Sequence, residues 1–262
     1  MRELTGHDPG TFCWPELATS NQAAAKAFYS ALFGWTVEEH PMGSAGVYTI
    51  FKDGNRDVAA ASGMQEEQRA QGVAPHWLSY ISVANAGDTA SKAKSLGGNE
   101  LMAPFDVMEL GRMAILQDPT GATFAVWQAK NHVGIRAAGE PGTLVWTELL
   151  TSNAETARDF YSKLFDWEVR LRPTKWSPLP YTVFMRGDEQ AGGMIQITPE
   201  MGNTPSQWLP YFGTSDTEAT TAKAQQVGGN VIVPPSDVPD VARFAILEDP
   251  QGATFGILRF AR

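Results

Sequence analysis

Two glutamates at matching positions are the strongest candidates for chemistry in this chain. Glu16 and Glu148 each lie two residues after a tryptophan, so in an extended strand the carboxylate and the indole face the same side. Such a carboxylate could act as a base with a raised pKa or hydrogen-bond a ligand, and we treat both glutamates as candidate catalytic residues. The alternative is structural, with Glu16 paired to Arg112 and Glu148 to Arg243 inside the fold. Both arginines are candidate ligand-binding residues, since a position opposite the glutamate fits either role.

His76 is a further candidate ligand-binding residue. It enters a predicted strand in the sequence Pro-His-Trp, and its imidazole could bind a metal or carry a proton near neutral pH. Gln207 occupies the matching position later in the chain and cannot transfer protons, so it is a candidate for ligand binding alone. The alternative for His76 is a half-exposed residue at a strand edge with no chemical role.

Large aromatic residues recur at predicted strand positions and could form flat pocket walls that stack on planar or cationic ligands. The candidates are Trp14, Tyr48, Trp77, Trp127, Trp146, Tyr181 and Trp208. Ordinary core filling is the alternative for each of them. Phe28, Tyr29, Phe33 and Trp35 follow the period of a helix and are expected in the core.

Composition and missing motifs exclude several classes of function. The chain has 262 residues and a net charge of −9, without a basic run, so neither a nucleic acid nor a membrane is expected as a partner. No glycine-rich phosphate loop, Ser-His-Asp order or Cys-x-x-Cys pair is present, so nucleophilic catalysis has no support. Cys13 is the only cysteine, and the chain starts without a signal-peptide pattern, which favours a cytoplasmic location with leaderless secretion left open.

The chain is duplicated. Residues Gly10–Asn21 return as Gly142–Asn153 at an offset of 132, and Asp118–Ala122 return as Asp249–Ala253 at an offset of 131. We therefore predict a first domain over residues 1–130, a linker over 131–141 that is rich in Gly and Pro, and a second domain over 142–262.

Each half contains two similar βαβββ units, which predicts an α+β fold with four units in all. In the first unit, a strand over 12–18 precedes a helix capped by Ser20 or Asn21 and ended by Gly34, with Ala24, Phe28, Ala31 and Leu32 on one face. Strands follow near 36–39, 47–51 and 58–63. After a polar linker over 65–75, the second unit has a strand over 76–83, a helix over 87–96, and strands near 99–104, 112–117 and 123–128.

The paired units, the helical sequence Ala25–Trp35 and the turn Asp118–Ala122, both repeated in the second half, resemble the vicinal-oxygen-chelate superfamily. This superfamily includes glyoxalases, bleomycin-resistance proteins and extradiol dioxygenases, and the tandem pattern is similar to glyoxalase-like actinobacterial proteins described as hydroxylases or culture-filtrate antigens. The resemblance covers nearly the whole chain. It implies two tandem glyoxalase-like domains, with a pair of cupped mixed sheets per half and cups that admit a small molecule. It also implies that the halves pair to complete shared cups.

Enzymes of this superfamily hold a divalent metal such as Zn, Ni, Mn or Fe with His, Gln or Glu side chains in the cup. Aligned by the resemblance, the ligand positions fall on Trp14, Leu78 and Ala125, and on Trp146, Leu209 and Gly256, none of which can ligate a metal. A register shift of two residues would instead present Glu16 with His76, or Glu148 with Gln207, and would still lack the closing carboxylate. We therefore expect no metal and no other cofactor.

Two functions follow as hypotheses. The first is a metal-free protein that binds a small apolar or aromatic molecule in tryptophan-lined cups. The second is a glyoxalase-type lyase or isomerase, or a related hydroxylase-like or dioxygenase-like enzyme, that uses Glu16 or Glu148 as a base or with a divalent metal. We expect a small-molecule partner and a chain that works as a monomer with its two domains paired, or as a homodimer.

Overall fold

The computed structural model describes residues 3–43, 46–174 and 179–261. The first half contains β1 (Phe12–Thr19), α1 (Gln22–Phe33), β2 (Thr36–Pro41), β3 (Val47–Asp53), β4 (Arg56–Gly63), α2 (Glu66–Ala70), β5 (His76–Ser82), α3 (Ala86–Ser95), β6 (Asn99–Val107), β7 (Gly111–Gln117) and β8 (Thr123–Ala129). The second half contains β9 (Leu144–Thr151), α4 (Ala154–Phe165), β10 (Glu168–Arg172), β11 (Tyr181–Arg186), β12 (Glu189–Gln196), η2 (Pro199–Met201), β13 (Gln207–Gly213), α5 (Thr217–Gln226), β14 (Asn230–Val238), β15 (Ala242–Glu248) and β16 (Thr254–Phe260). Four βαβββ units are therefore present, as the sequence predicts.

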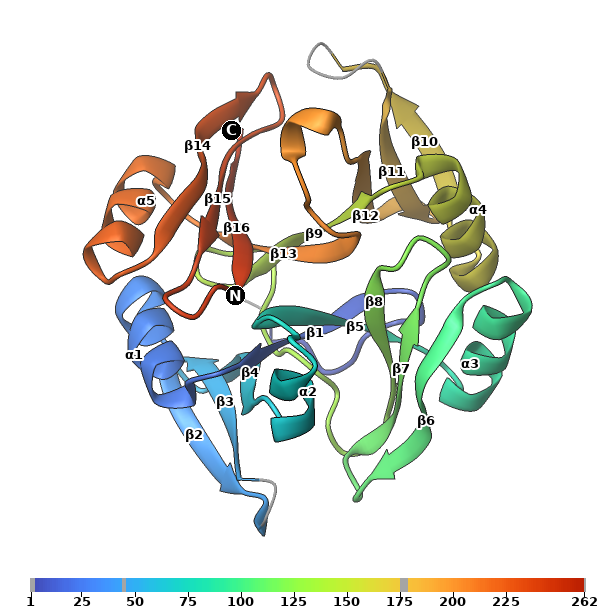
Figure 1. Cartoon of the computed structure of the whole chain (residues 1–262), viewed down its shortest axis with the longest axis horizontal. Coiled ribbons are helices and arrows are strands. Elements are labelled where there is room, and N and C mark those ends of the chain that lie inside the picture. The colour runs from blue at the N-terminus through green and yellow to red at the C-terminus, as the bar shows by residue number, and fades with distance from the viewer. Residues whose placement is uncertain (1–2, 44–45, 175–178, 262) are drawn as a thin grey trace.

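Each half forms one mixed sheet of eight strands. The strand orders are β2-β3-β4-β1-β5-β8-β7-β6 and β10-β11-β12-β9-β13-β16-β15-β14, so the two units of a half join through β1–β5 or β9–β13. The resemblance implied a pair of sheets in each half, but each half has one continuous sheet. It also implied cups shared between the halves, but the strands of each cup all come from one half. The two sheets and their helices are related by an approximate twofold arrangement that is visible in Figure 1.

Local signals explain the helix ends. The Asn21 side chain accepts a hydrogen bond from the Ala24 amide and begins α1, and Gly34 ends it in a left-handed conformation with φ of 78°. The buried face of α1 consists of Ala25, Phe28, Tyr29 and Leu32. Ala31 is exposed and Ala24 only half-buried, so the predicted face is rotated toward Ala25 and Tyr29.

The segment predicted as a polar linker over 65–75 contains the short helix α2. A capping box forms between Gln65 and Gln68, and none of the α2 side chains is buried. Among the described residues, no helix is long and apolar enough to cross a membrane.

The first helix of each half packs against the sheet of the other half. The side chains of α1 share a core with Phe212, Phe255 and Ile257 of β13 and β16, while α4 shares a core with Phe124 of β8. Figure 1 shows the result, with α1 beside α5 and α4 beside α3. The two halves therefore meet through these helices and through contacts of β5 and β8 with β13.

Hydrogen bonds of Trp35, Trp167 and Tyr29 join the two halves, and Tyr161 and Asp118 form a pair that matches one of them. Trp35 Nε1 donates to the Gly142 carbonyl at 2.8 Å, and Trp167 Nε1 donates to the Gly10 carbonyl at 3.1 Å. The Tyr29 hydroxyl donates to Asp249 Oδ2 at 3.0 Å. Tyr161 and Asp118 are the matching residues, and burial together with the Asp118 carboxylate raises the pKa of Tyr161. The repeated Phe-Tyr and Asp-Pro sequences thus join the two halves.

Candidate functional site

The N-terminal cup is the face of the first sheet that carries Trp14, Glu16, Tyr48, His76, Tyr80 and Trp127. Residues directly opposite in an antiparallel pair share a face, and Trp14 lies opposite Tyr80 while Glu16 lies opposite Leu78. His76 lies opposite Ala18 on the same face. The sequence expectation that Trp14, Glu16 and His76 share one side of the sheet therefore agrees with the structure.

Glu16 is the acceptor at the centre of this cup. Its Oε2 atom accepts hydrogen bonds from the hydroxyls of Tyr80 at 2.9 Å and Tyr48 at 3.1 Å, and its Oε1 atom accepts one from Ser62 at 3.0 Å. Trp14 Nε1 donates to the Tyr48 hydroxyl at 2.9 Å. One chain of donors therefore runs from the indole to the carboxylate.

The C-terminal cup repeats this arrangement with Trp146, Glu148, Tyr181 and Tyr211. Glu148 accepts from the Tyr181 hydroxyl at 2.8 Å and from the Tyr211 hydroxyl at 2.9 Å, and Trp146 Nε1 donates to the Tyr181 hydroxyl at 3.0 Å. Ser62 lies two residues after Ala60, the strand partner of Glu16. The residue two after Gly193, the strand partner of Glu148, is Ile195. Glu148 therefore has one hydroxyl donor fewer than Glu16.

Burial and hydrogen bonding act in opposite directions on the two carboxyl groups. Burial raises the pKa of Glu16 above its ordinary value, while the hydroxyl donors and the nearby His76 oppose that rise. Burial also raises the pKa of Glu148, against the two tyrosine donors. The four tyrosines have pKa values raised well above the ordinary value, chiefly by burial and then by the glutamates they contact.

Trp77 and Trp208 lie on the opposite face of the sheets from the two glutamates. Trp77 lies opposite Leu17, and its Nε1 donates to Tyr29 of α1 at 3.0 Å. Trp208 lies opposite Leu149, and its Nε1 donates to Tyr161 of α4 at 2.8 Å. Side chains alternate along a strand, so neither indole shares the cup face with the residue before it, His76 or Gln207.

The expected pairs between glutamate and arginine are not formed. Met113 faces the cup beside Trp127, so its neighbour Arg112 faces away, where it contacts Asp106 at 3.2 Å and the Pro104 carbonyl. Arg243 contacts Glu218 of α5 and Asp237. The two arginines therefore form ion pairs away from the glutamates. Tyrosine hydroxyls contact the glutamates in their place.

The donor set of the cups does not fit the superfamily metal. The position that the resemblance assigns to the closing carboxylate is Ala125 in the first half and Gly256 in the second, and these residues pair with Tyr80 and Tyr211. A Cβ atom at residue 256 would lie 2.1 Å from the Tyr211 ring, so a glutamate there would require this ring to move. The described residues contain no group of three His, Cys, Asp or Glu side chains arranged to hold a metal ion.

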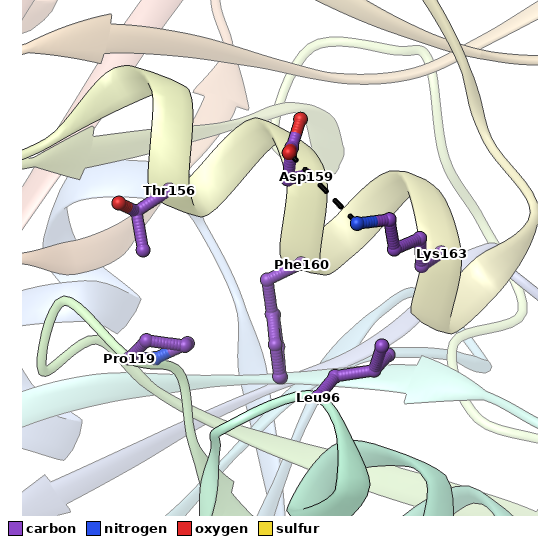
Figure 2. A pocket seen from close by; sticks show the side chains of 6 residues that line it. All are labelled: Leu96, Pro119, Thr156, Asp159, Phe160 and Lys163. Atoms are coloured by element: carbon purple, nitrogen blue, oxygen red, sulfur yellow. Dashed lines mark ion pairs between the residues drawn. The ribbon is translucent and has the colours of Figure 1, made fainter.

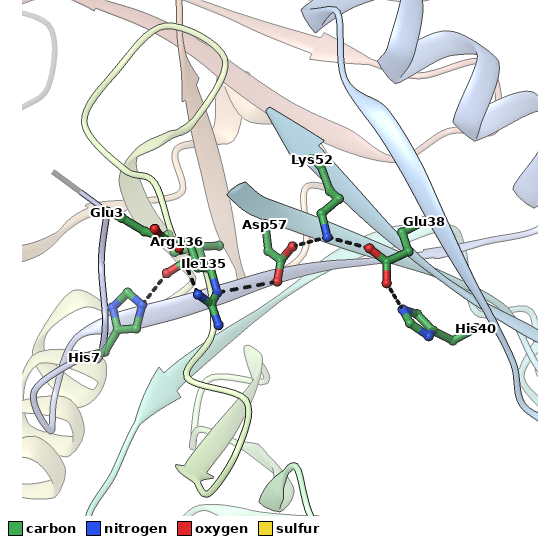
Figure 3. Close-up of polar contacts among 8 residues, drawn as sticks. All are labelled: Glu3, His7, Glu38, His40, Lys52, Asp57, Ile135 and Arg136. Carbon is green, nitrogen blue, oxygen red and sulfur yellow. Dashed lines mark hydrogen bonds and ion pairs between the residues drawn. The ribbon is translucent and has the colours of Figure 1, made fainter. Parts of the chain in front are cut away.

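The segment between the halves contributes His132 to the N-terminal cup. Its ring stands edge-on to Trp14 with centroids 4.6 Å apart, and its carbonyl accepts a hydrogen bond of 2.8 Å from Trp127 Nε1. Ile135 follows, with its amide donating to the Cys13 carbonyl at 2.8 Å and its carbonyl in contact with His7. Figure 3 shows how Arg136 then links Glu3 to Asp57, whose carboxylate also contacts Lys52.

Two surface hollows lie away from both glutamates. The hollow in Figure 2, of about 240 Å³, lies beside α4 and is lined by Leu96, Pro119, Thr156, Asp159, Phe160 and Lys163. Another, of about 350 Å³, lies at the end of β14 and β15 and includes Arg243 and Arg259. Of the predicted site residues, only Arg243 lines either hollow.

Sequence reasoning missed Tyr80, Tyr211, Ser62 and His132. The first two could have been found, because Tyr80 lies four residues after His76 and Tyr211 four after Gln207, which is the same face of a strand. Ser62 becomes visible only with the register of β1 against β4. His132 gives no signal, because its place depends on the path of the connection between β8 and β9.

The fold and the two clusters define a tandem protein of βαβββ units in which one acidic and aromatic site is built twice. Residues 12–126 and 143–257 each match the model of the Glyoxalase/Bleomycin resistance protein/Dioxygenase superfamily, and the chain belongs to this family. In Mycobacterium bovis, a protein named "Putative glyoxylase CFP32" is 39% identical over 263 residues, which cover 99% of this chain and 98% of that protein. The anthracycline biosynthesis protein DnrV of Streptomyces peucetius is 33% identical over 270 residues, covering 97% of this chain and 95% of that protein.

Solved structures show the same fold at low identity. The 2,3-dioxygenase LapB of Pseudomonas sp. KL28 superimposes with a TM-score of 0.66 at 10% identity and covers 96% of this chain and 93% of its own. The Mn(II)-bound glyoxalase of Novosphingobium aromaticivorans gives a TM-score of 0.65 at 12% identity, covering 95% of this chain and 82% of its own. The predicted family and fold class are thereby confirmed.

The raised pKa of Glu148 predicts a pH dependence of stability. The folded chain keeps a proton on this carboxyl at pH values where the unfolded chain has released it. The raised pKa therefore favours the folded state at low pH, and this stabilisation is lost as the pH rises through the folded pKa. We expect Glu148→Gln to gain stability relative to the wild type as the pH rises above about 4, the ordinary pKa of a glutamate. Urea unfolding across this range measures the difference.

Glu168→Gln is the matched control for this experiment, since Glu168 is exposed on β10. It should leave the pH profile of the wild type unchanged. If Glu148→Gln changed the free energy of unfolding by the same amount at every pH, this result would contradict the expected titration of Glu148.

Proposed function

We propose that this protein binds a small apolar or aromatic molecule in its cups without a bound metal. One observation carries the proposal: the positions that the family resemblance assigns to metal ligands hold Trp14, Leu78 and Ala125 in one cup and Trp146, Leu209 and Gly256 in the other. These side chains supply apolar surface where a metalloenzyme needs ligands. A few polar groups set in apolar walls are the usual construction of a small-molecule site.

The C-terminal cup illustrates this construction. Leu209, Tyr211, Ala242 and Leu258 form an apolar cluster of their own, against which Trp146, Phe244 and Ile246 pack while remaining partly exposed. The Glu148 cluster supplies the polar groups. The similarity to a protein of anthracycline biosynthesis supports a planar aromatic ligand class, since an anthracycline contains fused aromatic rings.

Titration with a neutral planar probe, 1,4-dihydroxyanthraquinone, tests the proposal. We expect saturable binding that is unchanged by prior treatment with EDTA and weakened at least about tenfold in the double variant Trp14→Ala/Trp146→Ala. Leu101→Ala, which changes an exposed apolar residue on β6, is the matched control and should bind as the wild type does. Equal binding by the double variant, or binding that requires an added metal, would overturn the proposal.

A glyoxalase-type lyase or isomerase is the second candidate. It is favoured by the two buried glutamates with raised pKa values, each within hydrogen-bond distance of tyrosine hydroxyls. A carboxylate of this kind can remove a proton next to a carbonyl group, and the mycobacterial relative carries a glyoxylase name. Turnover of the hemithioacetal of methylglyoxal, abolished by Glu16→Gln together with Glu148→Gln, would establish this function in place of binding alone.

A further inference from the structure

The edge strand β10 carries two arginines on the face of the sheet that forms the C-terminal cup. Arg172 lies directly opposite Tyr181 of β11, and Arg170 lies opposite Val183. Residues directly opposite each other in an antiparallel pair share a face, and the Tyr181 hydroxyl donates to Glu148 within the cup. Both arginines therefore stand on the cup side of the sheet, at its rim.

The charges of these two arginines are not neutralised by neighbouring carboxylates. Neither Arg170 nor Arg172 forms an ion pair with a residue that the structure describes, whereas Arg186 and Arg243 of the same half each contact two carboxylates. Both rim arginines are exposed. Glu168 shares their face at the far end of β10, is exposed, and likewise forms no ion pair within the described chain. Positive charge therefore exceeds negative charge along this rim.

The same positions in the first half hold an acidic residue and a histidine. In the pairing of β2 with β3, Glu38 and His40 take the places that Arg170 and Arg172 have in the pairing of β10 with β11. Glu38 forms ion pairs with both His40 and Lys52, as Figure 3 shows. The first half therefore neutralises this rim with its own side chains, which the second half does not.

Accessible surface connects Arg172 with the aromatic wall of the cup. Tyr181 lies beside Arg172 and is half-buried, and its hydroxyl accepts a hydrogen bond of 3.0 Å from the half-buried Trp146. Burial and the Glu148 carboxylate raise the pKa of Tyr181, and the charge of Arg172 opposes this rise, so the guanidinium group lies within electrostatic range of the hydroxyl. Glu148 itself lies on β9, and β11 and β12 separate it from β10. A flat molecule on Trp146 would therefore have positive charge at one edge.

We infer that the C-terminal cup binds an aromatic compound that carries a carboxylate, and that Arg170 and Arg172 bind this carboxylate. The inference rests on the proposed binding function, and it adds the charged group of the ligand and the side chains that select it. A guanidinium group can bind a carboxylate through two parallel hydrogen bonds. Because the whole chain has a net charge of −9, its overall field does not attract an anion, so a preference for one must arise locally.

Two anthraquinone probes test the role of the charge. Anthraquinone-2-carboxylate and anthraquinone-2-carboxamide have the same rings, and only the first is negatively charged. Each is titrated into the full chain by isothermal titration calorimetry at neutral pH and low salt. We expect the carboxylate to bind at least about tenfold more tightly than the carboxamide. The double variant Arg170→Gln/Arg172→Gln should lose this preference and bind the carboxamide as the wild type does.

Arg69→Gln/Arg259→Gln is the matched control, because it removes the same two charges from other exposed positions. Arg69 lies on α2, and Arg259 lies on β16 on the face opposite the cup, since its neighbour Leu258 packs in the cup cluster with Tyr211. We expect this control to keep the full preference for the carboxylate. Circular dichroism and an unchanged affinity for the carboxamide show that both double variants are folded with an intact cup.

Equal affinity of the two probes for the wild type would overturn the assignment and leave the proposed binding function standing. A carboxylate preference that persists in Arg170→Gln/Arg172→Gln would also overturn it, since the carboxylate would then bind elsewhere. Loss of the preference in the control variant as well would mean that overall charge, and not the rim of the cup, selects the ligand. If neither of these probes nor 1,4-dihydroxyanthraquinone binds, the proposed function fails together with the assignment.

Discussion

Trp208→Ala is expected to lower the free energy of unfolding by about 4 kcal/mol, the cost typical of removing a large buried aromatic side chain. Trp208 is 2% exposed, packs against Phe12 with ring centroids 4.8 Å apart, and donates to Tyr161. Phe12 comes from the other half of the chain, so the variant weakens both a core and the contact between the halves. Urea unfolding followed by circular dichroism measures the loss.

Trp146→Ala is the matched control, because it removes the same side chain from a half-buried position in the C-terminal cup. We expect it to cost about 1 kcal/mol and to weaken ligand binding. Equal destabilisation by the two variants would contradict the placement of Trp146 in an accessible cup and of Trp208 in the core.

Asp249→Ala is expected to destabilise the chain by about 3 kcal/mol, because it leaves several buried donors without an acceptor. Asp249 is 1% exposed and accepts from the amides of Gln251 and Ala253 at 2.8 and 3.0 Å. It also accepts from the Tyr29 hydroxyl at 3.0 Å across the two halves. The substitution therefore removes the hydrogen bonds of the turn and the hydrogen bond between the halves together.

A double-mutant cycle with Tyr29→Phe isolates the contact across the halves. The coupling between Asp249→Ala and Tyr29→Phe should be about 1 kcal/mol. Asp118→Ala removes the matching turn contacts to Thr120 and Ala122 and should show no coupling to Tyr29→Phe. A coupling near zero for the first pair would mean that the Tyr29 hydroxyl does not join the halves in solution.

Most of the fold could be predicted from the sequence because its signals are local or repeated. Asn21 and Gly34 fix the ends of α1, and the recurrence of Asp-Pro-x-Gly-Ala identifies the turn before β8 and before β16. The duplication at nearly constant spacing then extends each assignment from one half to the other. The packing of α1 on the opposite sheet has no such signal, because it depends on contacts more than 200 residues apart in sequence.

The candidate site could be predicted in part. Strand alternation places Trp14 and Glu16 together, and the same rule, applied from His76 to Trp77, would have separated Trp77 from the cup. The partner of Glu16 could not be deduced, since arginine and tyrosine both satisfy a buried carboxylate and only the register of three strands selects between them. His132 reaches the cup through the path of the connection between the halves, which residue types alone do not fix.

We propose that both cups work without a metal, and the metal stoichiometry of the purified chain tests this proposal most directly. The purified chain is stripped with EDTA, incubated separately with Zn, Ni, Mn and Fe(II), passed through a desalting column, and analysed for bound metal together with its thermal midpoint. We expect well under one metal per chain and no rise in the midpoint. One or more equivalents of metal per chain, lost in the variant Glu16→Gln/His76→Ala, would contradict the claim and identify the N-terminal cup as a metal centre.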